Sequence, residues 1–198
     1  MPRFAESSAE AAMRNRYLLM RHGHSQANAR GIIVSSPERG LDDFGLSPTG
    51  EAQLEALLAD WRWPAPTQAL HSDFRRTTET AARVAACFGL ALEPEPRLRE
   101  RHFGELEGQG DDRYPEVWAR DAEASDHRAF GVEPVSAVAT RMRAVVDALE
   151  ARHRGETLLL VSHGDPLQIL LAALEGQPLT RHRDRAPLAP ASITPFGD

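Results

Sequence analysis

Residues 17–25 read YLLMRHGHS and residues 158–165 read LLLVSHGD. In both stretches a short apolar run ends at a His-Gly pair, His22-Gly23 in the first and His163-Gly164 in the second. Short apolar runs of this kind are typical of strands that are buried on both faces of a parallel sheet. Ligands of such sheets bind beyond the carboxyl ends of the strands, so both histidines are expected at the same rim.

Helical patterns separate the apolar runs along the chain. Ser47-Pro48 is an N-cap followed by proline at the first helical position, and leucines at helical spacing follow it as far as Pro64. Strands alternating with helices predict an α/β fold, a three-layer, doubly wound, mainly parallel sheet with helices on both faces. The other predicted helices cover residues 75–88, about 138–154 and 166–174, with a short one in PEVWAR at 115–120, and the strands cover 17–20, 69–72, 90–92, 157–161 and 191–194.

Length and composition narrow the function classes. The 198 residues fit one domain, assigned to 17–198 after a loosely ordered leader at 1–16, in which Met13 is an alternative start to Met1. The formal charge of −6 argues against a nucleic-acid or membrane-surface partner. One cysteine, Cys87, in a helical pattern that favours a buried thiol, and no run of about 20 apolar residues point to the cytoplasm. Nothing in the sequence indicates the oligomeric state.

Three chemistries could use the residues of RHGHS, and two of them lack some of the other residues that they need. His22 and His24 could ligate a metal ion, as in hydrolases built on eight-stranded barrels, but such barrels need about 250 residues and no acidic or Cys/His cluster completes the ligand set. Residues 23–27, GHSQA, could form a serine elbow with Ser25 as nucleophile and His163 as base. That motif has glycine where Ala27 stands, and only one strand precedes it to provide an oxyanion hole.

A third chemistry makes His22 a nucleophile toward phosphorus, and it uses more of these residues. A neutral imidazole nitrogen has a free lone pair near pH 7 and can accept a phosphoryl group. Gly23 lets the backbone approach the phosphate, and a helix beginning near Ser25 aims its free N–H groups at the anion. Arg21 can donate charge-assisted hydrogen bonds to the phosphoryl oxygens.

Phosphoryl transfer needs further cations, because negative charge spreads over three equatorial oxygens. Residues 71–81, HSDFRRTTETA, place Arg75 and Arg76 at a helix start on the same rim. Arginines there oppose the helix dipole, which favours a functional role over a solvated surface position. His163 is a further member of this group.

The leaving oxygen also needs a proton, and water must later lose one. One carboxylic acid with a raised pKa can do both. Residues 98–108, LRERHFGELEG, contain Glu100, Glu105 and Glu107. An exposed charged loop is the simpler interpretation of Glu105 and Glu107.

Together these segments resemble one family. RHGHSQAN at 21–28 resembles the RHGxSxxN signature of the histidine phosphatase superfamily, also called the phosphoglycerate-mutase-like superfamily. LSPTGEAQ, SDFRRTTETA, LRERHFGELEG, LLLVSHGD and ASIT are similar to further segments of that family in the same order. The order and spacing of these motifs make the match specific, and it covers most of the chain. The resemblance implies the α/β fold above and the small phosphatase branch.

The resemblance also implies roles for individual residues. Glu100 falls on the family's proton donor. In the acid-phosphatase branch an aspartate directly follows the second histidine, where Gly164 stands here, so Asp165 is a second candidate. No metal and no organic cofactor is implied, because arginines and histidines stabilise the charge. His22 would be the phosphorylated nucleophile, and the phosphate would be bound by Arg21, Asn28, Arg76, His163 and Gly164.

The activity implied is that of a phosphatase acting on a small phosphorylated substrate. The string ERHFG is similar to the ERHYG of phosphoglycerate mutases, but Phe103 replaces their tyrosine hydroxyl and their paired arginines have no counterpart after this loop. A cofactor-dependent mutase is therefore the alternative, and a catalytically inactive binding protein a further one. Val132-Glu133-Pro134 departs from the Gly-Glu-Ser of related phosphatases, so no substrate is named.

Overall fold

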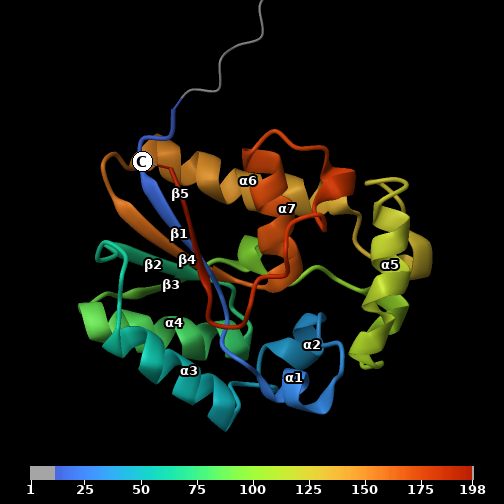
Figure 1. Ribbon diagram of the computed structural model, residues 1–198, viewed down its shortest axis with the longest axis horizontal. Coiled ribbons are helices and arrows are strands. Elements are labelled where there is room, and N and C mark those ends of the chain that lie inside the picture. Colours follow the sequence, from blue (N-terminus) through green and yellow to red (C-terminus); the bar gives the residue numbers. More distant parts are fainter. Residues whose placement is uncertain (1–11, 198) are drawn as a thin grey trace, which may run out of the picture.

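Strands and helices alternate along residues 12–197, the part of the chain that the computed structural model describes (Figure 1). The strands form one sheet in the order β3-β2-β4-β1-β5, and β5 runs antiparallel to β1 while the other pairs are parallel. The strands are β1 (Arg16–Arg21), β2 (Gln68–His71), β3 (Leu92–Pro94), β4 (Thr157–Ser162) and β5 (Ile193–Phe196). The α-helices are α1 (Gln26–Arg30), α2 (Pro37–Gly40), α3 (Pro48–Ala59), α4 (Arg75–Phe88), α5 (Tyr114–Asp121), α6 (Val135–Arg152) and α7 (Gly164–Leu174).

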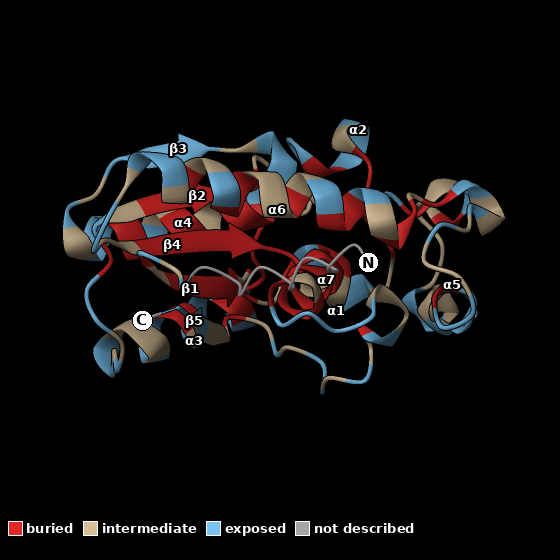
Figure 2. Cartoon of the chain, turned by 90° about the horizontal axis from the view of Figure 1, so that it is seen from above, coloured by how far each residue is buried: buried red, intermediate tan, exposed pale blue. Residues whose placement is uncertain are grey.

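Helices cover both faces of the sheet, which confirms the predicted three layers. In Figure 1, α3 and α4 lie on one side of the sheet and α6 and α7 on the other. Along β1, Leu18 and Met20 pack on the α3–α4 side, while Tyr17 and Leu19 pack on the α6–α7 side, as the two-residue period of a strand requires. Because β1 and β4 are buried on both faces (Figure 2), their sequences are continuous apolar runs.

Capping signals in the sequence set the helix boundaries. Ser47 caps α3 by accepting a hydrogen bond from the backbone N–H of Gly50, with Pro48 at the first helical position. Gly89 ends α4 in the left-handed conformation, with φ at 66°. Helix α7 begins at Gly164, two residues earlier than predicted, so the second His-Gly pair leads directly from β4 into the helix.

The two edge strands lie two residues later than the sequence predicted. The expected strands at 90–92 and 191–194 are observed as β3 and β5, and each contains a proline, Pro94 or Pro195. An edge strand has one unpaired side on which the missing N–H of proline is tolerated, so both strands can include these prolines. Ala191 has a φ of 60° and belongs to the turn that precedes β5.

Three further expectations from the sequence have different outcomes. Most of the leader expected over residues 1–16 lies outside the described residues, although Arg16 already belongs to β1. Cys87 is exposed on α4, which corrects the expected buried thiol. Segment 97–134 contains α5, which matches the short helix predicted at 115–120, and several short 3₁₀ helices. Within residues 12–197, no helix combines the length and apolar character needed to cross a membrane.

Candidate active site

The pairing of β1 with β4 places His22 beside His163. Arg21 and Ser162 are partners at the last rung of this parallel ladder, and the backbone N–H of His22 donates to the carbonyl of Ser162 at 3.1 Å. The two imidazole rings follow at once, with centroids 5.3 Å apart in an edge-to-face arrangement. Both histidines are buried, so sheet register fixes their relative position.

Hydrogen bonds define the tautomer of His22. Its Nδ1 lies 2.7 Å from the carbonyl oxygen of Gly23, which can only accept, so Nδ1 carries the proton. Its Nε2 accepts a hydrogen bond from Nε of Arg76 at 3.2 Å and therefore has a lone pair. Burial and the positive charges of Arg76 and Arg21 hold the pKa of His22 well below its ordinary value. His22 is thus a neutral imidazole with a free lone pair on Nε2.

Arg76 and Arg21 reach the same point from two elements. Arg76 starts the first turn of α4, is buried, and donates through Nη2 to the carbonyl of Val34 at 2.8 Å. Arg21 ends β1 and donates through Nη1 to the carbonyl of Leu188 at 2.6 Å. The neighbouring Arg75 is exposed and pairs with Glu79. Of the two arginines that the sequence offered, the structure therefore brings Arg76 to the histidines.

Three buried nitrogen atoms at this point have no hydrogen-bond partner among residues 12–197. They are Nε of Arg21, Nη1 of Arg76 and Nδ1 of His163. The other ring nitrogen of His163 lies 2.9 Å from Oγ of Ser72. Unpaired buried polar groups are costly, and they are expected where a ligand completes the hydrogen bonding. A tetrahedral oxyanion beside Nε2 of His22 would meet that requirement.

Glu100 is the carboxyl group closest to this cluster. Its Oε2 lies 3.8 Å from Nη2 of Arg76 and 3.8 Å from Nδ1 of His163. Burial raises the pKa of Glu100 to about 7, the negative charge of Asp165 adds to the rise, and the positive charges of Arg76 and Arg21 oppose it. Such a carboxyl group can donate and accept a proton near neutral pH.

Asp165 and the two other glutamates are less suited to proton transfer. Burial would raise the pKa of Asp165, but a hydrogen bond from His182 and the charge of Arg101 outweigh it and hold this pKa below its usual value. Glu105 is exposed, and Glu107 accepts hydrogen bonds from the backbone and hydroxyl of Ser35. Of these carboxyl groups, Glu100 therefore lies best for proton transfer, and burial raises its pKa to about 7.

Asn28 and Gly164 line the same cavity. The side-chain oxygen of Asn28 accepts from the backbone and hydroxyl of Ser25 in a capping box, which leaves its Nδ2 as a donor. Gly164 lies against Arg21, and a Cβ there would be 3.4 Å from Nε of Arg21. A Cβ on Gly23 would lie 3.1 Å from the side chain of Leu46 and 3.2 Å from the backbone oxygen of Gly50, so tight packing also favours glycine at this position.

The residues needed for a metal site at His22 and His24, or for a serine elbow at Ser25, are not brought together within residues 12–197. His24 pairs through Nδ1 with Oγ of Ser47 at 2.6 Å and does not line the cavity, so it does not join His22 as a metal ligand. The hydroxyl of Ser25 is engaged with Asn28, and His163 bonds Ser72 instead. The serine-elbow arrangement is therefore absent from the described residues.

Besides the two arginines, His22 and Glu100, the cavity has an aromatic wall that the sequence did not predict. It has a volume of about 290 Å³. Phe103 packs its ring 4.8 Å from that of Tyr114 at the start of α5, and Tyr114 stacks on Trp118 with an interplanar angle of 9°. Trp118 lines the cavity together with Arg183. Tyr114 directly precedes the short helix predicted at 115–120, and the sequence gives no indication that it lines the same cavity as Glu100.

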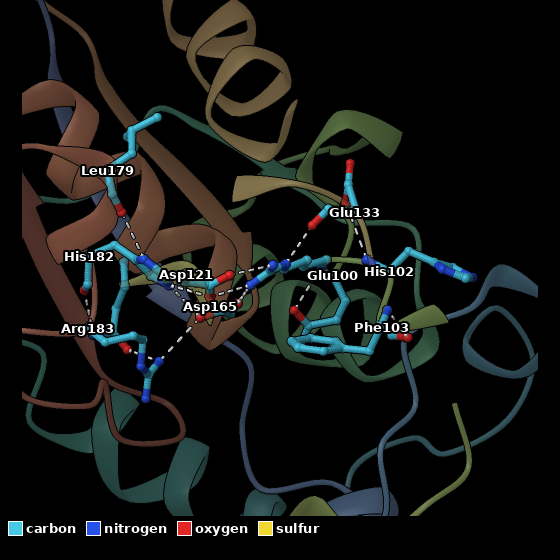
Figure 3. A network of polar contacts seen from close by, with 12 residues as sticks. Glu100, His102, Phe103, Asp121, Glu133, Asp165, Leu179, His182 and Arg183 are labelled. Atoms are coloured by element: carbon cyan, nitrogen blue, oxygen red, sulfur yellow. Dashed lines mark hydrogen bonds and ion pairs between the residues drawn. The ribbon is translucent and has the colours of Figure 1, made fainter. Parts of the chain in front are cut away.

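Behind this wall, a buried ion network joins three segments (Figure 3). Arg101 is fully buried and bonds Asp121 through both Nη atoms, at 2.7 and 2.9 Å, and Asp165 at 3.2 Å. His182 lies 3.2 Å from Asp165. Asp121, Asp165 and His182 have the spacing of metal ligands, but the guanidinium of Arg101 already bridges the two carboxylates. The network ties the segment of Glu100 to α5 and to α7.

Comparisons with known proteins find relatives over most of the chain. The family profile described as the histidine phosphatase superfamily (branch 1) matches residues 17–197. A probable phosphoglycerate mutase GpmB of Photorhabdus laumondii is 33% identical over 171 residues, or 83% of this chain and 77% of that protein. A metal-independent phosphoserine phosphatase of Arabidopsis thaliana is 29% identical over 160 residues, or 77% of this chain and 66% of that protein.

Solved structures show the same architecture. A mycobacterial glucosyl-3-phosphoglycerate phosphatase in complex with VO3 is similar with a TM-score of 0.76 and 28% identity, over 91% of each chain. YhfR of Bacillus stearothermophilus is similar with a TM-score of 0.76 and 26% identity, over 91% of this chain and 90% of that one. The predicted α/β architecture is confirmed by these neighbours.

Proposed function

The chain belongs to the histidine phosphatase superfamily, and from this we propose that it hydrolyses small phosphomonoesters through a phosphohistidine at Nε2 of His22. The observation that carries the proposal is the state of His22, whose Nδ1 is bonded to the carbonyl of Gly23 while Nε2 keeps a lone pair next to Arg76. Relatives named as phosphatases support it.

In the first step, Nε2 of His22 attacks phosphorus and the bond from phosphorus to the leaving oxygen breaks. Nε of Arg21, Nη1 of Arg76 and Nδ1 of His163 donate to the phosphoryl oxygens as charge develops on them. Glu100, protonated up to a pH of about 7, gives its proton to the leaving oxygen. The products are an alcohol, a phosphohistidine and an ionised Glu100.

In the second step, a water molecule attacks the phosphohistidine. Glu100, now a carboxylate, accepts a proton from the water as its oxygen bonds to phosphorus and the P–N bond breaks. Inorganic phosphate leaves, and His22 returns to the neutral tautomer that its bond to Gly23 favours. The same carboxyl group thus serves as acid and then as base.

A phosphoglycerate mutase is the second candidate, because the relative from Photorhabdus laumondii carries that name. A mutase must hold a bisphosphorylated intermediate, which takes more cations than hydrolysis does. The arginines that line the cavity are Arg21, Arg76 and Arg183. Mutase chemistry would appear as isomerisation of 3-phosphoglycerate that depends on added 2,3-bisphosphoglycerate.

The test is phosphate release from a panel of phosphomonoesters by wild type, His22→Ala and a matched control, His153→Ala. His153 lies just after α6, where its ring meets Gln68 at the first residue of β2, and it is outside the cavity. Release by wild type and the control, unaffected by a metal chelator and lost in His22→Ala, is expected. Equal release by wild type and His22→Ala would overturn the proposal, and no release from any ester would favour the mutase or a protein that only binds.

A further inference from the structure

We propose that Arg183 forms a subsite for a carboxylate on the leaving group, so that the enzyme selects phosphomonoesters of small hydroxy acids. This inference rests on the proposed hydrolysis at His22 and adds the substrate class. Arg183 belongs to the loop after α7, outside all the segments that bind the phosphoryl group, and its side chain lines the cavity. The cavity therefore contains a cation that the proposed phosphoryl site does not use.

Arg183 is held in place before any ligand arrives. Its guanidinium lies 3.7 Å from the ring centroid of Trp118, which itself stacks on Tyr114. Nη1 donates to Oε1 of Gln168 at 2.6 Å and lies 3.4 Å from Oδ1 of Asp165 (Figure 3). A guanidinium fixed by stacking and by hydrogen bonds loses little freedom when it binds an anion.

The donors of Arg183 are only partly used within the described residues. Nη1 makes both of its contacts, while Nε and Nη2 have no partner among residues 12–197. Asp165 is closer to Arg101, at 3.2 Å, than to Arg183, and it is also bonded to His182. The planar edge formed by Nε and Nη2 remains available, and this edge matches a carboxylate in two parallel hydrogen bonds.

The position of Arg183 suits the leaving group better than the phosphoryl group. Arg21, Arg76 and His163 already surround the phosphoryl position with unpaired nitrogens. The charge of Arg183 contributes to lowering the pKa of Arg21, so the two guanidiniums are close enough to interact across the cavity. The volume of about 290 Å³ fits a small ester. Beyond the phosphoryl position, the lining combines Arg183 with aromatic side chains and with the carboxylates of Asp111 and Asp165. One free guanidinium edge is enough for a carboxylate, whereas a second phosphate would require several cations.

The experiment compares esters that differ only in the carboxylate. 3-Phosphoglycerate is paired with glycerol 3-phosphate, and O-phosphoserine with O-phosphoethanolamine. For each pair the ratio of kcat/KM values, carboxylate ester over its partner, is measured by phosphate release. Because both esters are assayed on one preparation, the fraction of folded protein cancels from the ratio.

The wild-type ratio is expected to exceed one, and Arg183→Gln is expected to lower it by about 10- to 100-fold, the loss of one charge-assisted interaction with a carboxylate. Arg183→Lys should recover part of it, since a lysine keeps the charge but not the planar fork. The matched control is Arg181→Gln, an exposed arginine of the same loop that pairs with Asp184, and it should retain the wild-type ratio.

Three results would overturn the inference. A wild-type ratio near one for both pairs would show that the carboxylate is not recognised. A ratio unchanged in Arg183→Gln would assign the recognition to another residue. Both of these leave hydrolysis at His22 standing, whereas a wild type that hydrolyses no phosphomonoester would overturn the proposed function together with this subsite.

Discussion

The two ends of the cavity are built from different kinds of chain. At the end where we propose that the phosphoryl group binds, called the phosphoryl end, His22 and His163 follow adjacent parallel strands, and Arg76 lies in the first turn of α4. At the leaving-group end, α5 and the loop that carries Arg183 approach from irregular segments, with α5 set apart from the sheet in Figure 1. Ladder hydrogen bonds position the first end, and side-chain contacts position the second.

This difference suggests that the groups for the reaction and the groups that select the substrate lie on different parts of the chain. A rim fixed by strand register can hold the same catalytic groups on many substrates, while loops can change to fit one substrate. Glu100 and Arg101 lie between the two ends, because Glu100 faces the histidines and Arg101 bonds Asp121 of α5 and Asp165 of α7. Variants at these positions therefore test whether the two ends are as distinct as the structure indicates.

The largest effect is expected from Glu100→Gln, which keeps the shape of the side chain but removes the proton donor. Hydrolysis of alkyl phosphomonoesters should slow by about 10²- to 10⁴-fold, the usual contribution of a general acid. p-Nitrophenyl phosphate, whose leaving group needs no proton, should be affected much less in single-turnover phosphorylation. Equal losses on both esters would show that Glu100 acts on the site as a whole and not on the leaving oxygen.

Arg101→Ala tests whether the ion network joins the two ends. Removing the guanidinium leaves Asp121 and Asp165 buried without their shared cation, so the free energy of unfolding should fall by about 3–5 kcal/mol. Urea denaturation followed by circular dichroism measures this. Arg143→Ala, which removes a partly exposed pair with Asp147 on α6, should cost less than about 1 kcal/mol. Similar losses in the two variants would contradict a structural role for the network.

The pH dependence links Asp165 to the proton donor. Because Glu100 must be protonated in the free enzyme, kcat/KM should fall as pH rises through about 7. The negative charge of Asp165 contributes to that raised pKa, so Asp165→Asn should move the falling limb to lower pH. The profile of Glu100→Gln, which retains only the ionisation of the substrate, is the reference. A falling limb at the same pH in Asp165→Asn and in wild type would show that the charge of Asp165 does not raise the pKa of Glu100.

The smallest effect is expected at Tyr114, whose hydroxyl lies on the wall of the cavity. Burial and the negative charge of Glu100 raise the pKa of Tyr114, so the phenol stays protonated and can donate a hydrogen bond. Tyr114→Phe removes one neutral donor and should lower kcat/KM by about 2- to 10-fold. Phe103→Tyr, on the ring that packs against Tyr114, tests whether the cavity has space for one more hydroxyl group. A loss of more than about 100-fold in Tyr114→Phe would place this residue in the chemical step.

The phosphoryl end could be predicted from the sequence because its residues follow regular elements. Apolar runs located β1 and β4, and the capping residues Ser47 and Gly89 located the helices next to them. The choice of Arg76 over Arg75 and of Glu100 over its neighbours came from the resemblance to the family, since their spacing alone left them equivalent. In the structure, burial distinguishes Arg76 from Arg75, and the distances of Glu100 to Arg76 and His163 distinguish it from its neighbours.

The leaving-group end could not be predicted, for a physical reason. Arg101, Asp121 and Asp165 are far apart in the sequence, and nothing in a local pattern indicates that a guanidinium will bridge two buried carboxylates. Arg183 resembles any loop arginine until its contact with Trp118 is seen. The shifted edge strands have a similar cause, because whether a proline is tolerated depends on the neighbouring strand.

The most direct test of the account is to identify the phosphorylated atom. Wild type mixed with a labelled phosphomonoester, quenched in alkaline denaturant within milliseconds and digested, should give a peptide phosphorylated on Nε2 of His22, stable in base and labile in acid. His22→Ala should give no such peptide. An acid-stable label on Ser25, or turnover by His22→Ala at the wild-type rate, would contradict the account.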